Sequence, residues 1–302
     1  MLSLEQLTKI RKLTIIALFS DDDLMFNLVL KGGNALEIGY GLNSRASIDI
    51  DVSMIEEFKA IGLNNLDEIK NKLEVALDKA FEPEEYKVFD VKIKQVPKKG
   101  NHENEDFWGG YEASFKIIDP EDYQKNEENT FALNAKAIST NDGKKKVTID
   151  FGRFEYSDSR ISQEIDGYYI QIYTPELILF EKIRAICQQM PVYLESIGKE
   201  ARYGRPRPRD FYDIFTILES DKIPELDLSS EENRQHLLKC FEAKKVPINL
   251  ISEIKESYDF HAQGESKLFD AVLNKKEYKE FKFYFNYVLN VIDKRILITE
   301  KV

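Results

Sequence analysis

The sequence has few of the residues that build disulfide scaffolds or histidine-based metal centres. It contains two cysteines, Cys187 and Cys240, and three histidines, His102, His236 and His261. The cysteines form no CxxC pair and no two histidines lie within one helical turn. These spacings argue against a secreted disulfide scaffold, a structural zinc site and an HExxH protease. The chemistry must therefore rest on other side chains.

Long hydrophobic runs are absent as well. The apolar stretch near the N-terminus, 15–19, is followed by three aspartates and by no cleavage site of small residues. No run approaches the ~18–20 residues that are needed to cross a bilayer. We therefore expect a soluble, cytoplasmic protein that has no membrane partner.

Positive charge is in deficit, with 43 Lys and Arg against 54 Asp and Glu and a net charge of −11. A protein that coats nucleic acid without selectivity carries a positive surface, because the neutralisation of phosphates drives that binding. The 42% of hydrophobic residues is enough for a folded core, which excludes disorder of the whole chain. Any contact with nucleic acid must therefore use a local basic patch.

The periodicity of the apolar residues changes along the chain. Alternation and short apolar runs predict strands at 28–30, 47–54, 86–95, 111–118, 146–153 and 168–173. Helical spacing predicts helices at 3–27, 34–40 and 65–81, and almost continuous helix from about residue 175 onward. The change near residue 174 predicts an α+β fold with two domains: 1–173, which mixes strands and helices, and 174–302, which is mainly helical.

Two glycines and two aspartates follow each other in the segment 31–53, which contains KGGNAL and SIDIDVS. Gly32 and Gly33 let the backbone approach a phosphate closely, and the N–H groups that follow favour an anion. Asp49 and Asp51 share one face of a strand. Paired carboxylates hold hard cations such as Mg²⁺, and two such ions can clamp a displacement at phosphorus. Neither pattern is specific alone, but together they predict a nucleotide phosphate site.

Two further features leave alternatives open. Asp150, in the strand KVTIDFGR, either completes a two-metal site or is an exposed acid on an edge strand. Trp108 lies in a polar loop at 97–110, where it could cover a nucleotide base.

Four arginines lie close together before a helix that contains Asp210: Arg202, Arg205, Arg207 and Arg209. Guanidinium groups match phosphate oxygens, so this density suggests phosphate contact. The alternative is a solvated, proline-stiffened loop that is capped by Asp210.

Four motifs in order resemble the AbiEii/AbiGii toxin family of bacterial nucleotidyltransferases. LKGGNAL at 30–36 is similar to the family's LKGGTAL, and RASIDID at 45–51 is similar to its RxSxDxD. The helix 174–185, with EKIRA at its end, resembles a family helix that ends in EKxxA. RDFYDI at 209–214 resembles (K/R)DxxD.

The resemblance implies a DNA polymerase β-like nucleotidyltransferase fold, which has a small mixed sheet flanked by helices and then a helical part. It assigns nucleotide binding to Lys31, Gly32, Gly33, Arg45 and Ser47. It assigns catalysis to Asp49, Asp51, Lys182 and Asp210, and metal binding to Asp49, Asp51 and, in the place of the superfamily's third acid, Asp150. We expect Asp49 and Lys182 to lie on polar faces, so that alanine at either position abolishes catalysis and leaves the fold intact.

The implied function is a toxin of a toxin–antitoxin or phage-defence system. It would transfer a nucleotide from an NTP to an acceptor hydroxyl at the 3′ end of tRNA, with one or two Mg²⁺ ions, and a cognate antitoxin would oppose it. The tRNA would contact Arg202, Arg205, Arg207 and Arg209. The alternatives are nucleotidylation of a protein side chain and a non-catalytic module that binds a nucleotide for regulation.

Overall fold

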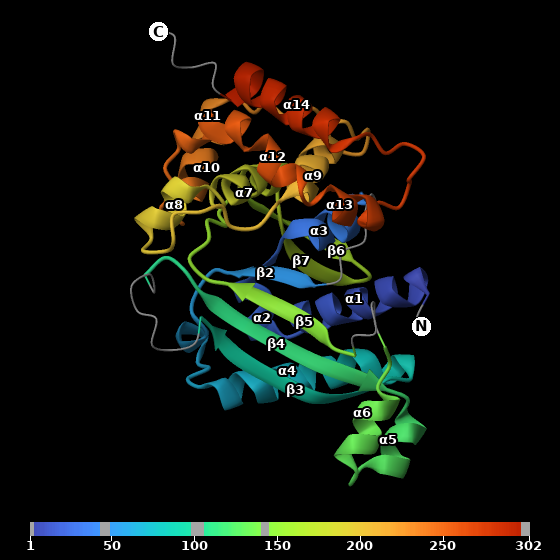
Figure 1. Ribbon diagram of the computed structural model, residues 1–302. Helices are drawn as coiled ribbons and strands as arrows, with labels where there is room; N and C mark the ends of the chain where they lie inside the picture. The colour runs from blue at the N-terminus through green and yellow to red at the C-terminus, as the bar shows by residue number, and fades with distance from the viewer. Residues whose placement is uncertain (1–2, 43–48, 98–105, 140–144, 297–302) are drawn as a thin grey trace.

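The computed structural model of the chain describes residues 3–42, 49–97, 106–139 and 145–296. Within these ranges, a seven-stranded mixed sheet has the strand order β3-β4-β5-β2-β1-β7-β6 (Figure 1). Its strands are β1 Leu28–Leu30, β2 Ile50–Met54, β3 Lys87–Val96, β4 Gly110–Ile118, β5 Val147–Gly152, β6 Arg160–Ile165 and β7 Tyr168–Tyr173. The sheet and its helices confirm the predicted α+β class.

The centre of the sheet is built from strands with one apolar face. β2 pairs with β1 in antiparallel and with β5 in parallel orientation. In β5, buried Val147, Ile149 and Phe151 alternate with half-buried residues that include Asp150. One face of the strand therefore joins the hydrophobic core, while the other presents a carboxylate.

Helices α1 (Leu4–Phe19), α2 (Asp22–Asn27) and α4 (Leu66–Phe81) pack on the sheet. α1 contacts α4 and β7, and α4 contacts β3, so both helices lie on the same face (Figure 1). The predicted single helix 3–27 is wrong: the Asp21 side chain accepts hydrogen bonds from Asp23 N and Leu24 N and starts α2. A carboxylate that caps backbone N–H groups ends one helix and begins the next.

Three short elements do not appear in the sequence-based prediction. Strand β6 forms the sheet edge beside β7, and helices α5 (Pro120–Asn126) and α6 (Thr130–Lys136) project beyond the end of the sheet (Figure 1). Each has six or seven residues with little apolar periodicity, so the sequence pattern does not indicate a helix or a strand there.

After Thr174 the described elements are helical: α7 Pro175–Cys187, α8 Pro191–Ser196, α9 Pro208–Leu218, α10 Glu231–Glu242, α11 Leu250–Glu253, α12 Tyr258–Ala262, α13 Glu265–Ala271 and α14 Phe281–Val291. They lie together above the sheet in Figure 1. One cluster of buried hydrophobic side chains runs through both parts of the chain. The division into domains 1–173 and 174–302 stays a proposal. Among the described residues, no helix is long and apolar enough to span a membrane.

Candidate active site

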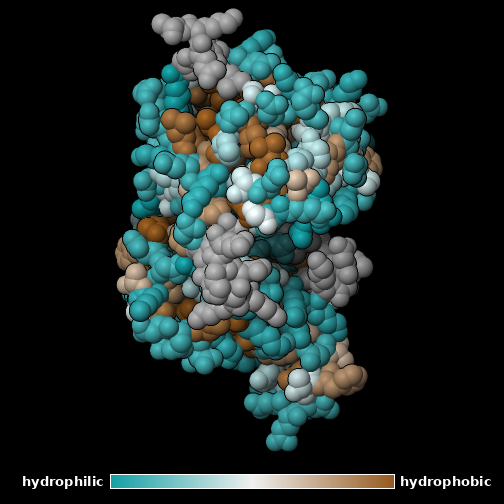
Figure 2. All heavy atoms as spheres, turned by 60° about the vertical axis from the view of Figure 1, so that its left-hand side comes forward, coloured by the Kyte–Doolittle hydropathy of each residue, from teal (hydrophilic) through white to brown (hydrophobic). Residues whose placement is uncertain are grey.

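A cleft of about 1930 Å³ lies where the sheet meets the helical part. Figure 2 shows a hollow between the upper and lower parts of the molecule, with hydrophilic residues along its visible walls. The lining includes every described residue that the sequence assigned to nucleotide binding, metal binding or catalysis. Arg45 and Ser47 lie outside the described residues.

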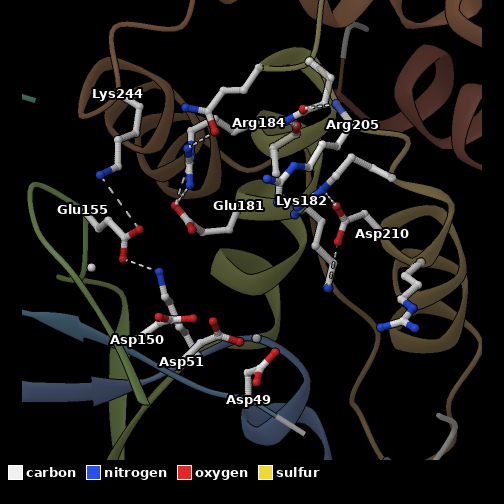
Figure 3. Close-up of a pocket in the computed structure, with 18 of the residues that line it drawn as sticks. Asp49, Asp51, Asp150, Glu155, Glu181, Lys182, Arg184, Arg205, Asp210 and Lys244 are labelled. Carbon is white, nitrogen blue, oxygen red and sulfur yellow. Dashed lines mark hydrogen bonds and ion pairs between the residues drawn. The ribbon is translucent and has the colours of Figure 1, made fainter. Parts of the chain in front are cut away.

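Three carboxylates gather on the sheet side of the cleft (Figure 3). Asp51 on β2 and Asp150 on β5 are direct partners in the parallel register, and Asp49 immediately precedes β2. β5 lies between β4 and β2, so Asp150 is not an acid on an edge strand. The topology therefore brings together carboxylates that are a hundred residues apart in the sequence.

Burial and neighbouring negative charge raise the pKa of Asp51 and of Asp150. Burial raises the pKa of Asp51, with a further contribution from Asp49, whereas Lys31 opposes the rise. The pKa of Asp150 is raised to about 6 by burial and by the charges of Asp51 and Asp49. An excess of negative charge is thus held in one place, as at sites that bind cations.

The donor chemistry fits Mg²⁺, which prefers carboxylate oxygens together with substrate phosphates. Within the described part of the chain, no group of three or more His, Cys, Asp or Glu side chains is arranged to hold a metal ion by itself. Asp49, Asp51 and Asp150 would therefore need a phosphate or water to complete the coordination of an ion.

A glycine turn lies directly against this carboxylate group. Gly32 has φ +66°, and a Cβ atom there would lie 3.0 Å from Asp51 Oδ2. Lys31 N donates to Asp51 O at 3.1 Å, which ties the turn to β2. The turn leads into α3 (Gly32–Asn34) and the π-helix η1 (Ala35–Gly39). Asn34 Nδ2 donates to Asp49 O at 2.7 Å, so the same segment fixes the backbone of Asp49.

Helices α7 and α9 bring Lys182 between two carboxylates. Lys182 Nζ lies 2.5 Å from Asp213 Oδ2 and 3.4 Å from Asp210 Oδ1. All three residues are buried, so the structure argues against the expectation that alanine in place of Lys182 leaves the fold intact. The carboxylates of α9 neutralise its charge and make burial possible. Lys182 is also close enough to the sheet side to lower the pKa of Asp51.

The arginines before α9 do not all face the cleft. Arg205, Arg207 and Arg209 line it, whereas Arg202 does not. Arg202 is exposed and its Nε lies 3.1 Å from Glu200 Oε2. Arg205 and Arg207 lie in the loop before α9, and Arg209 lies in the first turn of that helix. We call these three residues the basic loop. The loop is fixed to its surroundings by two hydrogen bonds: Arg205 N to Gln189 Oε1 at 2.8 Å and Arg207 N to His261 Nδ1 at 3.0 Å.

Arg207 also holds Asp210, through a contact of 2.6 Å between its Nε and Asp210 Oδ2. Burial raises the pKa of Asp210, but Arg207 and Lys182 outweigh that effect and keep the pKa below its ordinary value. Asp210 is therefore a carboxylate, and it links the basic loop to Lys182.

The sequence analysis missed Glu155, which lies in the cleft wall and joins its two sides (Figure 3). Its carboxylate accepts hydrogen bonds from Lys31 Nζ and Ser53 Oγ on the sheet side. On the helical side, Lys244 Nζ lies 3.9 Å from Glu155 Oε1. Burial raises the pKa of Glu155, but Lys31 and Lys244 outweigh it and lower the pKa to about 2.

Gly152 makes room for this carboxylate. A Cβ atom on Gly152 would lie 2.4 Å from Glu155 Oε2. Between them, Phe154 adopts φ +55°, a left-handed conformation that turns the chain back toward the cleft. The glycine followed by an acid in DFGRFE is the only local signal for this arrangement that the sequence offers.

Three solved structures are similar to the chain at low identity. They are JHP933 from Helicobacter pylori (19% identity, TM-score 0.44, covering 97% of this chain and 94% of that one), an antigenic nucleotidyltransferase-like protein from Paracoccidioides brasiliensis (18%, 0.37, 85% and 93%), and the nucleotidyltransferase toxin MenT4 from Mycobacterium tuberculosis (9%, 0.33, 93% and 92%). No curated protein matches the chain. The family described as "Nucleotidyl transferase AbiEii toxin, Type IV TA system" matches residues 15–289.

Proposed function

Because the chain belongs to the AbiEii nucleotidyltransferase toxin family of type IV toxin–antitoxin systems, we propose that it transfers a nucleotide from an NTP to the 3′-terminal hydroxyl of tRNA with the help of Mg²⁺. The family shows that the protein is a nucleotidyltransferase and has an antitoxin as its counterpart. The metal, the acceptor and the roles of individual residues are our proposal.

The observation that carries the proposal is the division of charge across the cleft. The sheet side carries Asp49, Asp51 and Asp150 beside the glycine turn, and the opposite side carries Lys182 and the basic loop of Arg205, Arg207 and Arg209. A triphosphate needs both a cation-binding carboxylate group and fixed positive charge. A polyanionic acceptor needs a basic surface in a protein whose net charge is otherwise negative.

The residues of the chain would divide the work as follows. The Gly32–Gly33 turn would receive the triphosphate, since its backbone is open to close approach. Asp49, Asp51 and Asp150 would hold Mg²⁺, which when bound would neutralise phosphate charge and activate the acceptor hydroxyl. Lys182, fixed by Asp210 and Asp213, would face the phosphates from α7.

The lining of the cleft favours direct transfer to the acceptor. Among the described residues that line it there is no cysteine, histidine or serine, three of the side-chain types that act as nucleophiles in covalent catalysis. Phosphoryl transfer needs positioning and electrostatic stabilisation, with the attacking and leaving oxygens roughly in line. Carboxylates, glycines and cations supply these.

A transfer assay tests the proposal. The purified protein is incubated with Mg²⁺, each α-labelled NTP in turn and total tRNA, and the products are separated on a denaturing gel. We expect label on tRNA that disappears with Asp49→Ala. Asp158→Ala, which removes an exposed acid outside the cleft lining, is the matched control and should keep full activity.

Label on a protein and none on tRNA would instead support nucleotidylation of a side chain. Transfer that persists in Asp49→Ala would overturn the metal assignment. Binding of NTP without transfer to any RNA or protein would leave the non-catalytic alternative as the better explanation.

A further inference from the structure

Trp108 is an aromatic side chain in the lining of the charged cleft. It is 38% exposed and lines the cleft together with Val96, Pro97 and Ile197. It is also the only tryptophan in the sequence. An aromatic ring that is partly exposed within a cleft, rather than buried in the core, is typical of a surface on which a planar ligand stacks.

The backbone is fixed on both sides of Trp108. Phe107 is buried, and Lys245 Nζ lies 4.4 Å from the centre of its ring. After Trp108, a Cβ atom on Gly110 would lie 1.9 Å from Phe151 O, so β4 approaches β5 as only glycine permits. Trp108 therefore lies between an apolar anchor and a close strand contact, which fixes its position before any ligand arrives.

The ammonium group of Lys199, from the helical side of the cleft, lies over the ring of Trp108. Lys199 Nζ lies 3.2 Å from the centre of the Trp108 ring. Lys199 follows α8 in the helical part, and burial lowers its pKa. Arg205 belongs to the same side of the cleft. Lys199 thus covers one face of the ring, so a base would stack on the opposite face. An aromatic ring with a cation beside it is the combination that binds single-stranded nucleic acid through bases and phosphates.

The order of the strands places Trp108 on one side of the carboxylates. In the sheet, β1 lies on one side of β2, and the glycine turn follows β1. On the other side of β2 lies β5, and beyond β5 lies β4. Trp108 lies two residues before the first residue of β4, whose Glu112 is the partner of Asp150. If the triphosphate occupies the glycine turn, an in-line attack must come from the opposite side. That is the side of β5, β4 and Trp108, the side of the acceptor rather than that of the NTP.

We propose that Trp108 and Lys199 form a subsite that stacks the unpaired terminal base of a single-stranded RNA acceptor. The inference rests on the proposed function, in which the triphosphate binds at Gly32–Gly33, and deepens it: the acceptor must end in unpaired nucleotides. A blunt duplex cannot present a free base to the ring. A protein acceptor would make no use of the stacked base, and is the outcome that competes with ours.

Fluorescence of the single tryptophan tests the subsite without any variant. The full chain is titrated with a short single-stranded RNA, with a blunt duplex of the same sequence, and with each NTP in separate experiments. We expect the single strand to quench the emission of Trp108 and to protect it from a soluble quencher, while duplex and NTP leave it unchanged. Quenching by NTP but not by RNA would place Trp108 on the nucleotide side, and an unchanged signal with every RNA would overturn the subsite.

Kinetics of variants give a second, independent measurement. Trp108→Ala should raise the KM for the RNA acceptor by roughly tenfold, the usual order for one stacked base, with an unchanged KM for NTP and unchanged kcat at saturating acceptor. Trp108→Tyr should restore most of the affinity. Phe131→Ala removes an 85% exposed ring outside the cleft lining and should change nothing. A KM for RNA that is the same in Trp108→Ala and wild type would contradict the subsite.

The two proposals fail in different ways. If wild-type protein transfers label to no RNA, the proposed function fails, whatever the fluorescence shows. If wild type labels RNA but does so equally well without Trp108, the function stands and the subsite is refuted.

Discussion

Replacing Lys182 with alanine is expected to weaken the fold as well as to stop transfer. The Lys182 ammonium lies 2.5 Å from Asp213 Oδ2 and 3.4 Å from Asp210 Oδ1, and all three side chains are less than a tenth exposed. Breaking a buried ion pair from one side costs about 3–5 kcal/mol, because the opposite charge stays out of water without that partner.

The structure places the effect near the lower end of this range. Asp210 keeps its contact with Arg207 at 2.6 Å, so the loss falls mainly on Asp213. We therefore expect a decrease of about 3 kcal/mol in the free energy of unfolding. At about 2–3 °C per kcal/mol for a chain of this size, the melting temperature should fall by roughly 6–9 °C.

Thermal unfolding, followed by circular dichroism, and the tRNA transfer assay should be run on the same samples. Asp49→Ala is the matched variant, because Asp49 is exposed and its loss should change stability by less than about 0.5 kcal/mol. The double variant Lys182→Met with Asp213→Asn removes both charges and should recover much of the stability. A melting temperature of Lys182→Ala equal to that of wild type would refute the reasoning.

Three further predictions concern the sheet side of the cleft. Asp150→Asn should stabilise the metal-free protein at about pH 8 but not at about pH 4, because the pKa of Asp150 is raised in the folded state: the charged carboxylate destabilises the fold above that pKa, and this penalty disappears as the pH falls through it. Urea unfolding of wild type and variant at both pH values checks this, and equal stabilities of the two proteins at about pH 8 would contradict it. Added Mg²⁺ should raise the melting temperature of wild type and not of Asp150→Asn, and an equal rise in both would argue against Asp150 as a ligand. Gly152→Ala should cost about 1–3 kcal/mol, because its Cβ would meet Glu155 Oε2 at 2.4 Å; a variant as stable as wild type in urea would show that Glu155 can move aside at no cost.

The parts of the site that sequence could predict are those with a local signature. The alternation around Asp49 and Asp51 predicts that both carboxylates serve one site, and both line the cleft, although Asp49 lies just before β2 and not within it. The glycine pair before them implies a turn. The structure adds that the turn contacts Asp51 directly. These features depend on residues within one short segment, so their pattern is visible without knowledge of the fold.

The parts that sequence could not predict depend on distant pairing. The partner of Asp51 is fixed by the choice of β5 as the neighbour of β2, and periodicity does not determine which strands pair. The helical pattern around Lys182 gives no sign that Asp213 lies opposite, and Lys31 meets Glu155 across 124 residues. The end of α1 and the start of α2 at Asp21 could not be predicted for another reason: each of three consecutive aspartates could cap a helix equally well.

The two sides of the cleft, which meet at the contact between Glu155 and Lys244, are synthesised at different times. A ribosome releases a chain from its N-terminus, so the carboxylates of β2 and β5 emerge long before the cations that face them. Lys182, the basic loop and Lys244 come from later segments. A nascent or truncated chain that ends before Lys182 therefore carries half of the cleft and is expected to be harmless to the cell that makes it. We therefore expect the toxin to become active only when most of its length has been translated.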